Sequence, residues 1–294
     1  MKTIFYIIIL FFFSITNVFA QEDFKYNLIG VLLLENNVSY AYRLSFNINN
    51  KKISGVSYTD LGGKDETKSR IKGSFNPNDK SFSFKEYAID YTKSEIKDFS
   101  SFCYLSASGK FKVNNKRRML KGDLYGIYKG KDTCAKGDII LLSDVFVNKK
   151  INKIYKKVSK KKKLADTIKE VFNPDKFKDM SKASILNAGE TINYASENDY
   201  IYLFVWDRQK EDGDNVTVFV NDKIVVDNLS ITNDKYRLKI DLKKGKNEIK
   251  IRANNEGELP PNTADIRVDV LNNRHHLSTK LNVNETASII IYRE

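Results

Sequence analysis

The segment 206–214 carries the residue types best suited to holding a metal ion. It reads Trp-Asp-Arg-Gln-Lys-Glu-Asp-Gly-Asp, so Asp207, Asp212 and Asp214 lie around a glycine turn. Calcium takes about six to eight oxygen ligands, and a tight loop rich in aspartate supplies several of them. The spacing differs from that of an EF-hand, and the arginine and lysine in the loop weaken the negative field that a hard cation needs. The segment therefore indicates either a calcium site formed by the three aspartates or a polar hairpin whose Asp-Gly pair serves only the turn.

A second polar loop, residues 253–264, contains two prolines and is expected to join two strands. Loops between the strands of a sandwich often carry ligand-binding residues. Four of its side chains suit the hydroxyl groups of a sugar or an outer position around calcium: Asn254, Glu256, Asn262 and Thr263. The alternative is that the loop only crosses from one sheet to the other.

Three aromatic side chains share one face of a predicted strand, namely Tyr200, Tyr202 and Trp206. Side chains two positions apart on a strand point the same way. Such a row can stack on sugar rings, which makes Trp206 a candidate binding residue. A row of this kind more often forms one wall of a hydrophobic core, and we favour that interpretation.

Enzyme motifs are weak. The only histidines, His275 and His276, are adjacent, so on a strand they point to opposite faces and cannot serve one site. The sequence has no Gly-x-Ser-x-Gly, no His-Glu-x-x-His and no phosphate-binding loop. A pair of carboxylates of the glycosidase type stays open but has no location in the sequence. We therefore predict no catalytic residues.

The first 20 residues predict a cleavable signal peptide. Lys2 is followed by an apolar run over 4–13, which is shorter than the roughly 20 residues of a spanning helix. Cleavage is expected before Gln21, and no transmembrane segment is predicted in the mature chain. The protein is thus expected to be secreted or periplasmic.

The two cysteines, Cys103 and Cys134, are expected to form a disulfide in that oxidising compartment. The alternative is two free thiols. Both cysteines flank strand-like segments, so the bridge would join neighbouring strands.

Residues 24–147 show about eight short strands separated by turns, with almost no helical pattern. A meander of this kind must hide its edges, and closure into a barrel does so most completely. We predict a small antiparallel, lipocalin-like barrel over 21–147, with a sandwich as the alternative.

The formal net charge of +13 is concentrated in Lys149–Lys163, which holds nine lysines and no acid. This segment indicates either a solvated spacer or a contact with an envelope polysaccharide or another anionic surface. No zinc, helix-turn-helix or RNA-binding pattern is present, so nucleic acid is not an expected partner. Apolar residues at helical spacing over 164–172 predict a short helix, and 148–184 is predicted to be a basic, partly helical linker.

Residues 185–294 return to a strand pattern, with eight or so strands at regular spacing. This pattern predicts a β-sandwich, jelly-roll-like in connection.

Several short motifs carry a resemblance to secreted all-β proteins of Bacteroidota. In the second half they are Asp207 with Asp212-Gly213-Asp214, Val218-x-Val220-Asn221, Gly245-x-Asn247, Ala253-Asn254-x-x-Gly257 and Pro261-Asn262-Thr263-Ala264. In the first half they are Ile53-Ser54-Gly55, Cys103, Leu120-x-Gly122 and Cys134-x-x-Gly137. The chain resembles a two-domain envelope protein of that group. The resemblance implies little about function, since these modules are largely uncharacterised.

Three functions follow from these patterns. The first is an exported, non-enzymatic binding or adhesion protein of the cell envelope, with the C-terminal sandwich as a carbohydrate-binding module. The second is a carrier of a small apolar ligand inside the N-terminal barrel. The third is a hydrolase that uses a pair of acids.

Overall fold

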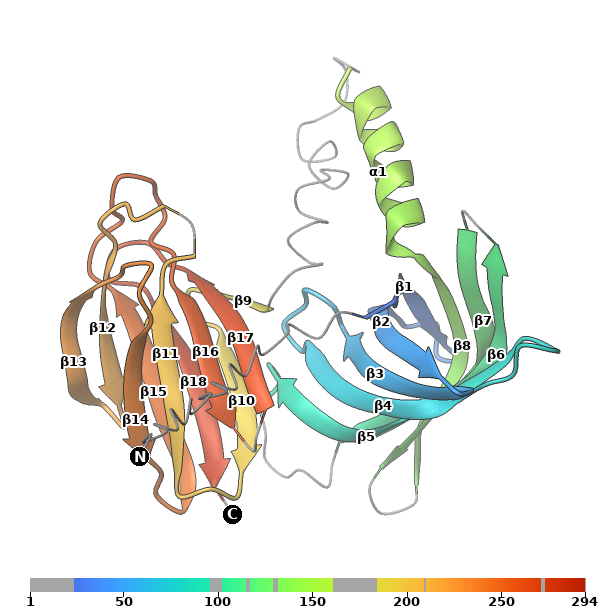
Figure 1. The fold of residues 1–294 in the computed structure, drawn as a ribbon, viewed down its shortest axis with the longest axis horizontal. Helices are drawn as coiled ribbons and strands as arrows, with labels where there is room; N and C mark the ends of the chain where they lie inside the picture. The colour runs from blue at the N-terminus through green and yellow to red at the C-terminus, as the bar shows by residue number, and fades with distance from the viewer. Residues whose placement is uncertain are drawn as a thin grey trace, which may run out of the picture.

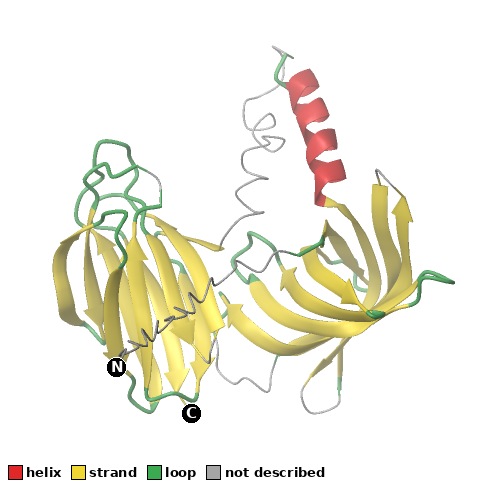
Figure 2. Cartoon of the chain, viewed as in Figure 1, coloured by secondary structure: helices red, strands yellow, loops and turns green. Residues whose placement is uncertain are grey.

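The computed structural model consists almost entirely of β-strands, with one helix among the described residues (Figures 1 and 2). It describes residues 24–95, 102–114, 117–128, 132–160, 184–208, 210–270 and 273–293. The predicted signal peptide (1–20) and the predicted linker helix (164–172) lie outside the described residues. No helix in the described ranges has the length and apolar character needed to cross a membrane.

Eight antiparallel strands close into a barrel, as the sequence predicted. They are β1 (Tyr26–Leu34), β2 (Ser39–Asn49), β3 (Lys52–Thr59), β4 (Thr67–Phe75), β5 (Ser81–Thr92), β6 (Cys103–Asn114), β7 (Arg117–Tyr128) and β8 (Thr133–Ser143). Each strand pairs with the next one in sequence, and β8 returns to pair with β1. Closure leaves no free edge along the barrel wall.

Aromatic side chains pack against one another inside the barrel. The ring centroids of Phe46 and Phe82 are 5.2 Å apart, and each lies within 5.7 Å of Phe111. All three side chains are buried. These residues occupy inward positions on β2, β5 and β6, and burying them favours closure of the sheet.

A disulfide joins Cys103 on β6 to Cys134 on β8, which confirms the predicted pair. The bridge joins the two strands on either side of β7 rather than direct neighbours. Gly126 of β7 lies beneath it, and a Cβ there would run into both sulfur atoms. Glycine is therefore needed at this position for the bridge to cross the strand.

The helix α1 (Asp144–Val158) begins directly after β8 and projects away from the barrel (Figure 1). Five of the lysines assigned to a spacer lie on this helix, so the first part of Lys149–Lys163 is helical rather than extended. Lysine has a good helix propensity, and Phe146, Ile151 and Tyr155 recur at near-helical spacing between the lysines. The run of like charge obscured this pattern in the sequence.

The rest of the chain forms two further groups of strands. The first group has the order β13-β12-β15-β18-β10, and the second has the order β14-β11-β16-β17-β9. The first contains β10 (Thr191–Ser196), β12 (Asn215–Val220), β13 (Lys223–Ser230), β15 (Gly245–Ala253) and β18 (Thr286–Arg293). The second contains β9 (Ser184–Asn187), β11 (Tyr200–Trp206), β14 (Tyr236–Asp241), β16 (Asp265–Val270) and β17 (Asn273–Lys280). The four-residue strand β9 was not predicted, because it is too short to show a period.

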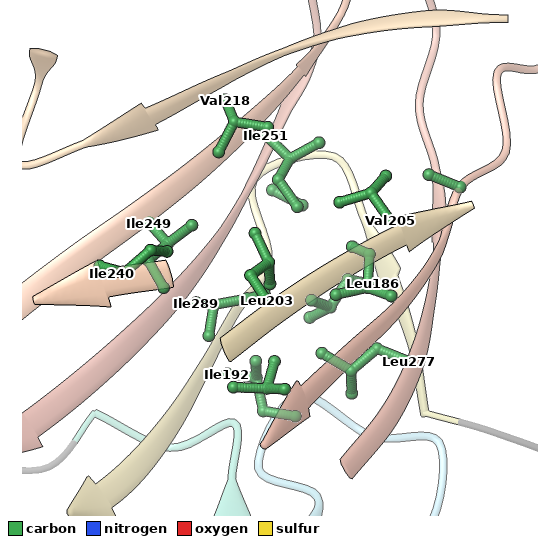
Figure 3. Packing of buried hydrophobic residues seen from close by; sticks show 14 of the residues in the cluster. Leu186, Ile192, Leu203, Val205, Val218, Ile240, Ile249, Ile251, Leu277 and Ile289 are labelled. Carbon is green, nitrogen blue, oxygen red and sulfur yellow. The ribbon is translucent and has the colours of Figure 1, made fainter. Parts of the chain in front are cut away.

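These two groups of strands share one hydrophobic core (Figure 3). Leu203 and Val205 of the five-stranded sheet belong to the same buried cluster as Ile249, Ile251 and Ile289 of the other group. The barrel has a separate core of its own. Burial on one face of each sheet leaves the outer face free to carry polar and charged residues.

The barrel connects to the first of these groups through β5 and β10. Asn193 pairs with Thr92, and its side-chain amide donates to the carbonyl oxygens of Thr92 (3.2 Å) and Ser94 (3.0 Å). Lys93 forms a 3.0 Å ion pair with Glu190 beside this contact. These contacts make β5 and β10 neighbours in one continuous run of hydrogen-bonded strands.

Removing the disulfide is expected to destabilise the protein. The bridge closes a loop of 31 residues, for which chain entropy gives about 3–4 kcal/mol. Urea unfolding of the double variant Cys103→Ser/Cys134→Ser should show this loss relative to the parent protein. An unchanged unfolding free energy would contradict a structural role for the bridge.

Candidate functional site

Two long loops cross between the sheets at one end of the second half of the chain (Figure 2). The loop from β11 to β12 contains Asp212 and Asp214, and the loop from β15 to β16 contains residues 254–264. The amide of Glu258 donates to the main-chain oxygen of Asp212 (2.8 Å). The amide of Thr263 donates to Asp214 Oδ2 (2.7 Å). The aspartates of the first loop therefore hold the backbone of the second.

Asp214 is the most deeply buried carboxylate of these loops, with 1% of its surface exposed. Its pKa is raised from 3.8 to about 6, mainly by burial and also by Asp212, Asp207 and Glu256, while the hydrogen bond from Thr263 opposes the shift. The neighbouring charges that shift this pKa are thus other carboxylates. The fold concentrates negative charge here instead of neutralising it.

Three buried side-chain oxygens at this end of the molecule have no hydrogen-bond partner: Asp212 Oδ1, Asp214 Oδ1 and Asn262 Oδ1. Gly257 lies next to two of them. An ideal Cβ at this position would lie 2.8 Å from the main-chain oxygen of Asp212, and 2.9 Å from both Asp212 Oδ1 and Asp214 Oδ1. Gly257 also has a φ of 56°, a conformation that favours glycine. Three oxygens therefore lie so close to Gly257 that a Cβ at this position would displace them.

The predicted calcium residues are only partly brought together. Asp212 and Asp214 share the position beside Gly257, and Asp207 is close enough to raise the pKa of Asp214. Over the described ranges, no three histidine, cysteine, aspartate or glutamate side chains are grouped as ligands of one metal ion. The three-aspartate centre is therefore not formed as predicted, and a cation here would need backbone oxygens as well.

The predicted sugar-binding residues of the second loop mainly hold the loop itself. The Asn254 amide donates to Thr217 Oγ1 (2.9 Å) and to Asn228 Oδ1 (3.0 Å). The Asn262 amide donates to the carbonyl oxygens of Asn215 and Asn255, and Asn262 is fully buried.

The other two predicted residues of this loop also make loop contacts. Glu256 accepts a hydrogen bond from the amide of Val283, and Thr263 contributes its main-chain amide to Asp214. The second loop thus crosses between the sheets, and its amides organise that crossing.

The aromatic row of β11 faces away from the core, which corrects the interpretation that we favoured. Ile201, Leu203 and Val205 are the buried residues of this strand, so the aromatic residues alternating with them lie on the outer face. Tyr200 is 42% exposed. The all-apolar sequence of β11 hid which parity was the inner one, because both of its faces read as hydrophobic.

Trp206 is part of this row but is covered, with 5% of its surface exposed. Lys235 lies 5.0 Å and Arg208 5.8 Å from its ring centroid, and the His276 ring meets it edge-on at 6.1 Å. Its ring is therefore not open to a stacking sugar in this conformation.

Cations cover the faces of the other aromatic rings. Arg237 lies 3.9 Å from the centroid of Tyr202, Arg267 lies 3.7 Å from that of Phe204, and Lys239 lies 4.7 Å from that of Tyr200. Lys239 pairs with Asp241 and Arg267 with Asp269. Arg237 has no acidic partner among the described side chains.

Our sequence interpretation missed these cations. The signal was present in β14, where Arg237 and Lys239 alternate with the inward-facing Leu238 and Ile240. Only the strand pairing shows that β14 lies beside β11, which brings the two sets of side chains together.

The two histidines lie on opposite faces, as predicted from their adjacency. His276 contacts Trp206 on the outer side, whereas His275 is 6% exposed and packs on Tyr194 with ring centroids 4.7 Å apart. The pKa of His275 is lowered from 6.5 to about 4, mainly by burial and also by Lys68 and Arg70, while Asp90 opposes the shift. His275 is thus a neutral packing residue at the junction with the barrel.

Comparison with known proteins gives no match: no family model, no curated protein and no solved structure matches the chain.

Acidification should weaken the fold through His275. The folded protein keeps this ring neutral down to a pKa of about 4, while an unfolded histidine takes up a proton near pH 6.5. Because the unfolded state binds more protons, the unfolding free energy falls as the pH drops from 6.5 to 4, by roughly 3 kcal/mol in total.

Urea unfolding from about pH 7.5 to about pH 4.5 measures this dependence. The variant His275→Gln should lose less stability over that range than the parent protein. Equal losses in the two proteins would show that His275 does not titrate as described.

Proposed function

We propose that the protein is an exported, non-enzymatic binding protein of the cell envelope that recognises an acidic polysaccharide. The proposed binding surface is the outer face of the five-stranded sheet, centred on Tyr202 and Arg237. The lysines of α1 would add a second, less specific attraction to the same polymer. Asn254, Glu256, Asn262 and Thr263 would position this module rather than touch the sugar.

The observation that carries this proposal is the row of aromatic rings and cations on an outer face. Tyr200, Tyr202 and Phe204 lie in line, with centroids 5.4 Å and 6.5 Å apart between successive rings. Neither core includes these rings. Aromatic rings suit the apolar faces of sugars, and arginine binds carboxylate groups through two parallel hydrogen bonds.

An acidic sugar fits this face better than a neutral one. The guanidinium of Arg237 lies over the Tyr202 ring, so a neutral sugar would have to displace it before stacking. A uronate or a sulfated sugar would instead bind the guanidinium while its ring packs beside the aromatic row. The absence of an acidic partner for Arg237 among the described residues leaves that charge available.

The two other functions have less support from the geometry. A carrier of an apolar ligand needs an empty barrel interior, and here Phe46, Phe82 and Phe111 contact one another inside it. A hydrolase needs carboxyl groups that substrate can reach, and Asp214 is 1% exposed. We keep both as alternatives to the binding function.

The proposal includes the architecture that the sequence predicted around this surface. We propose an N-terminal barrel domain (21–147), a basic linker (148–184) and a jelly-roll-like sandwich (185–294), exported by the signal peptide 1–20. The two separate hydrophobic cores support this division. The origin among secreted proteins of Bacteroidota rests on the sequence motifs alone.

Binding of the mature protein to a polyuronate such as alginate and to neutral dextran tests this proposal. Alginate should bind and dextran should not. The variant Arg237→Gln should weaken alginate binding about tenfold, as expected for losing one charge-assisted contact. Biolayer interferometry with immobilised polysaccharide gives both affinities.

The matched control is Arg118→Gln on the barrel. Arg118 also lies over a tyrosine ring, 4.9 Å from the centroid of Tyr26, so this variant removes the same charge and the same stacking from another surface. Its affinity should equal that of the parent protein. Equal weakening by both variants, or loss of binding only when Lys149, Lys150 and Lys153 are replaced by glutamine, would contradict the proposed face.

A further inference from the structure

The geometry points to a calcium site between the two crossing loops, held by Asp212 and Asp214 beside Gly257. Asp212 would contribute its main-chain oxygen and Oδ1, and Asp214 would contribute Oδ1. The argument is independent of the polysaccharide proposed above, because these residues lie on the loops and not on the outer face of the sheet.

The first support is the buried, unpartnered oxygens. Burying a carboxylate oxygen without a hydrogen bond costs folding free energy, and native proteins rarely leave such an oxygen without a partner. Asp214 is 1% exposed, and its Oδ1 has no partner, while its Oδ2 is held by the Thr263 amide. Asp212 is held in the same way, with Oδ2 accepting from the Leu259 amide and Oδ1 without a partner.

The second support is that these oxygens converge. The point at which Gly257 would carry a Cβ lies within 2.9 Å of both Oδ1 atoms and of the Asp212 main-chain oxygen. The three oxygens are therefore close enough together to bind one calcium ion beside Gly257, at its usual distance of about 2.3–2.6 Å. A side chain at residue 257 would displace them.

The third support is the absence of a protein cation. Over the described residues, no lysine or arginine forms an ion pair with Asp212 or Asp214. The two basic residues that weakened the sequence prediction are engaged elsewhere. Arg208 pairs with Asp265 at 3.4 Å and Lys210 with Glu258 at 3.4 Å.

The donor set favours calcium among the common metals. Carboxylate, carbonyl and amide oxygens are hard ligands, and no histidine or cysteine is grouped with them in the described part of the chain. Calcium accepts main-chain carbonyls and an irregular arrangement completed by water, whereas magnesium demands a near-ideal octahedron. The buried Oδ1 of Asn262 is a further oxygen at this end of the fold.

Such an ion would link the two loops that connect the sheets. Each loop runs from one sheet to the other. The two loops are joined by hydrogen bonds such as those to Asp212 and Asp214. An ion bound to the first loop beside Gly257 of the second would neutralise the buried charge and stiffen both crossings. The native state alone would hold it, so binding would raise the melting temperature.

Calorimetric titration of calcium into the chelator-treated mature protein tests the site. We expect one calcium ion per chain and a melting temperature that rises with millimolar calcium and rises less with magnesium. Asp214→Asn should weaken calcium binding at least about tenfold. Gly257→Ala should do the same while every carboxylate is retained, because its Cβ would lie 2.8–2.9 Å from the three ligand oxygens and displace them.

The matched control is Glu258→Gln, which removes one exposed charge from the same loop and should leave calcium binding unchanged. If Asp214→Asn fails to fold, Gly257→Ala and Asp212→Asn carry the test. No heat and no rise in melting temperature with calcium would overturn the inference. Undiminished calcium binding by Gly257→Ala and Asp214→Asn, or an equal response to magnesium, would overturn it as well.

Discussion

Burying the carboxylate of Asp214 is the constraint on which the loop end of the second half depends. Withdrawing a carboxylate from water costs free energy unless hydrogen bonds or a counter-charge replace the lost solvent. One of its oxygens is satisfied by the Thr263 amide, and this bond fixes the start of β16 against the loop that precedes β12. The pKa of Asp214 is raised to about 6 because burial and the neighbouring carboxylates destabilise its negative charge. The second loop, with Gly257 and Thr263, contacts this group.

Elsewhere in the molecule, alternate side chains of a strand point to opposite faces, one packed in a core and the other carrying candidate binding residues. On β11, one parity supplies the shared core and the other supplies the aromatic row that meets the cations of β14 and β16. In the barrel, the inner parity carries a cluster of mutually packed aromatic rings. The contact between β5 and β10 joins this barrel to the second half of the chain. The outer face of the five-stranded sheet carries the aromatic rings and cations that we propose as the binding surface.

The barrel could be predicted from the sequence, because alternation and turn residues are local signals. All eight of its strands lie within the predicted range 21–147. The disulfide could be predicted because only two cysteines exist. The short β9 and the helix α1 were missed, since a four-residue strand has no period and a block of lysines masks an amphipathic pattern.

The candidate site was harder to predict, because its parts are joined only by the fold. The aspartates of the first loop could be singled out by residue type, yet Gly257, which lies beside Asp212 and Asp214, is more than 40 residues away in the sequence. Trp206 was chosen for its residue type, and only the structure shows that Lys235 and Arg208 cover it. Which parity of β11 faces outward, and which cations meet it, follows from pairing between distant strands.

Anomalous diffraction from crystals grown with calcium tests the central claim most directly, since it locates the ion without relying on a variant. The account predicts one strong peak beside Gly257, at about 2.3–2.6 Å from Asp212 Oδ1, the Asp212 main-chain oxygen and Asp214 Oδ1. A calcium peak elsewhere, or ordinary water bound at this position in the presence of calcium, would contradict it.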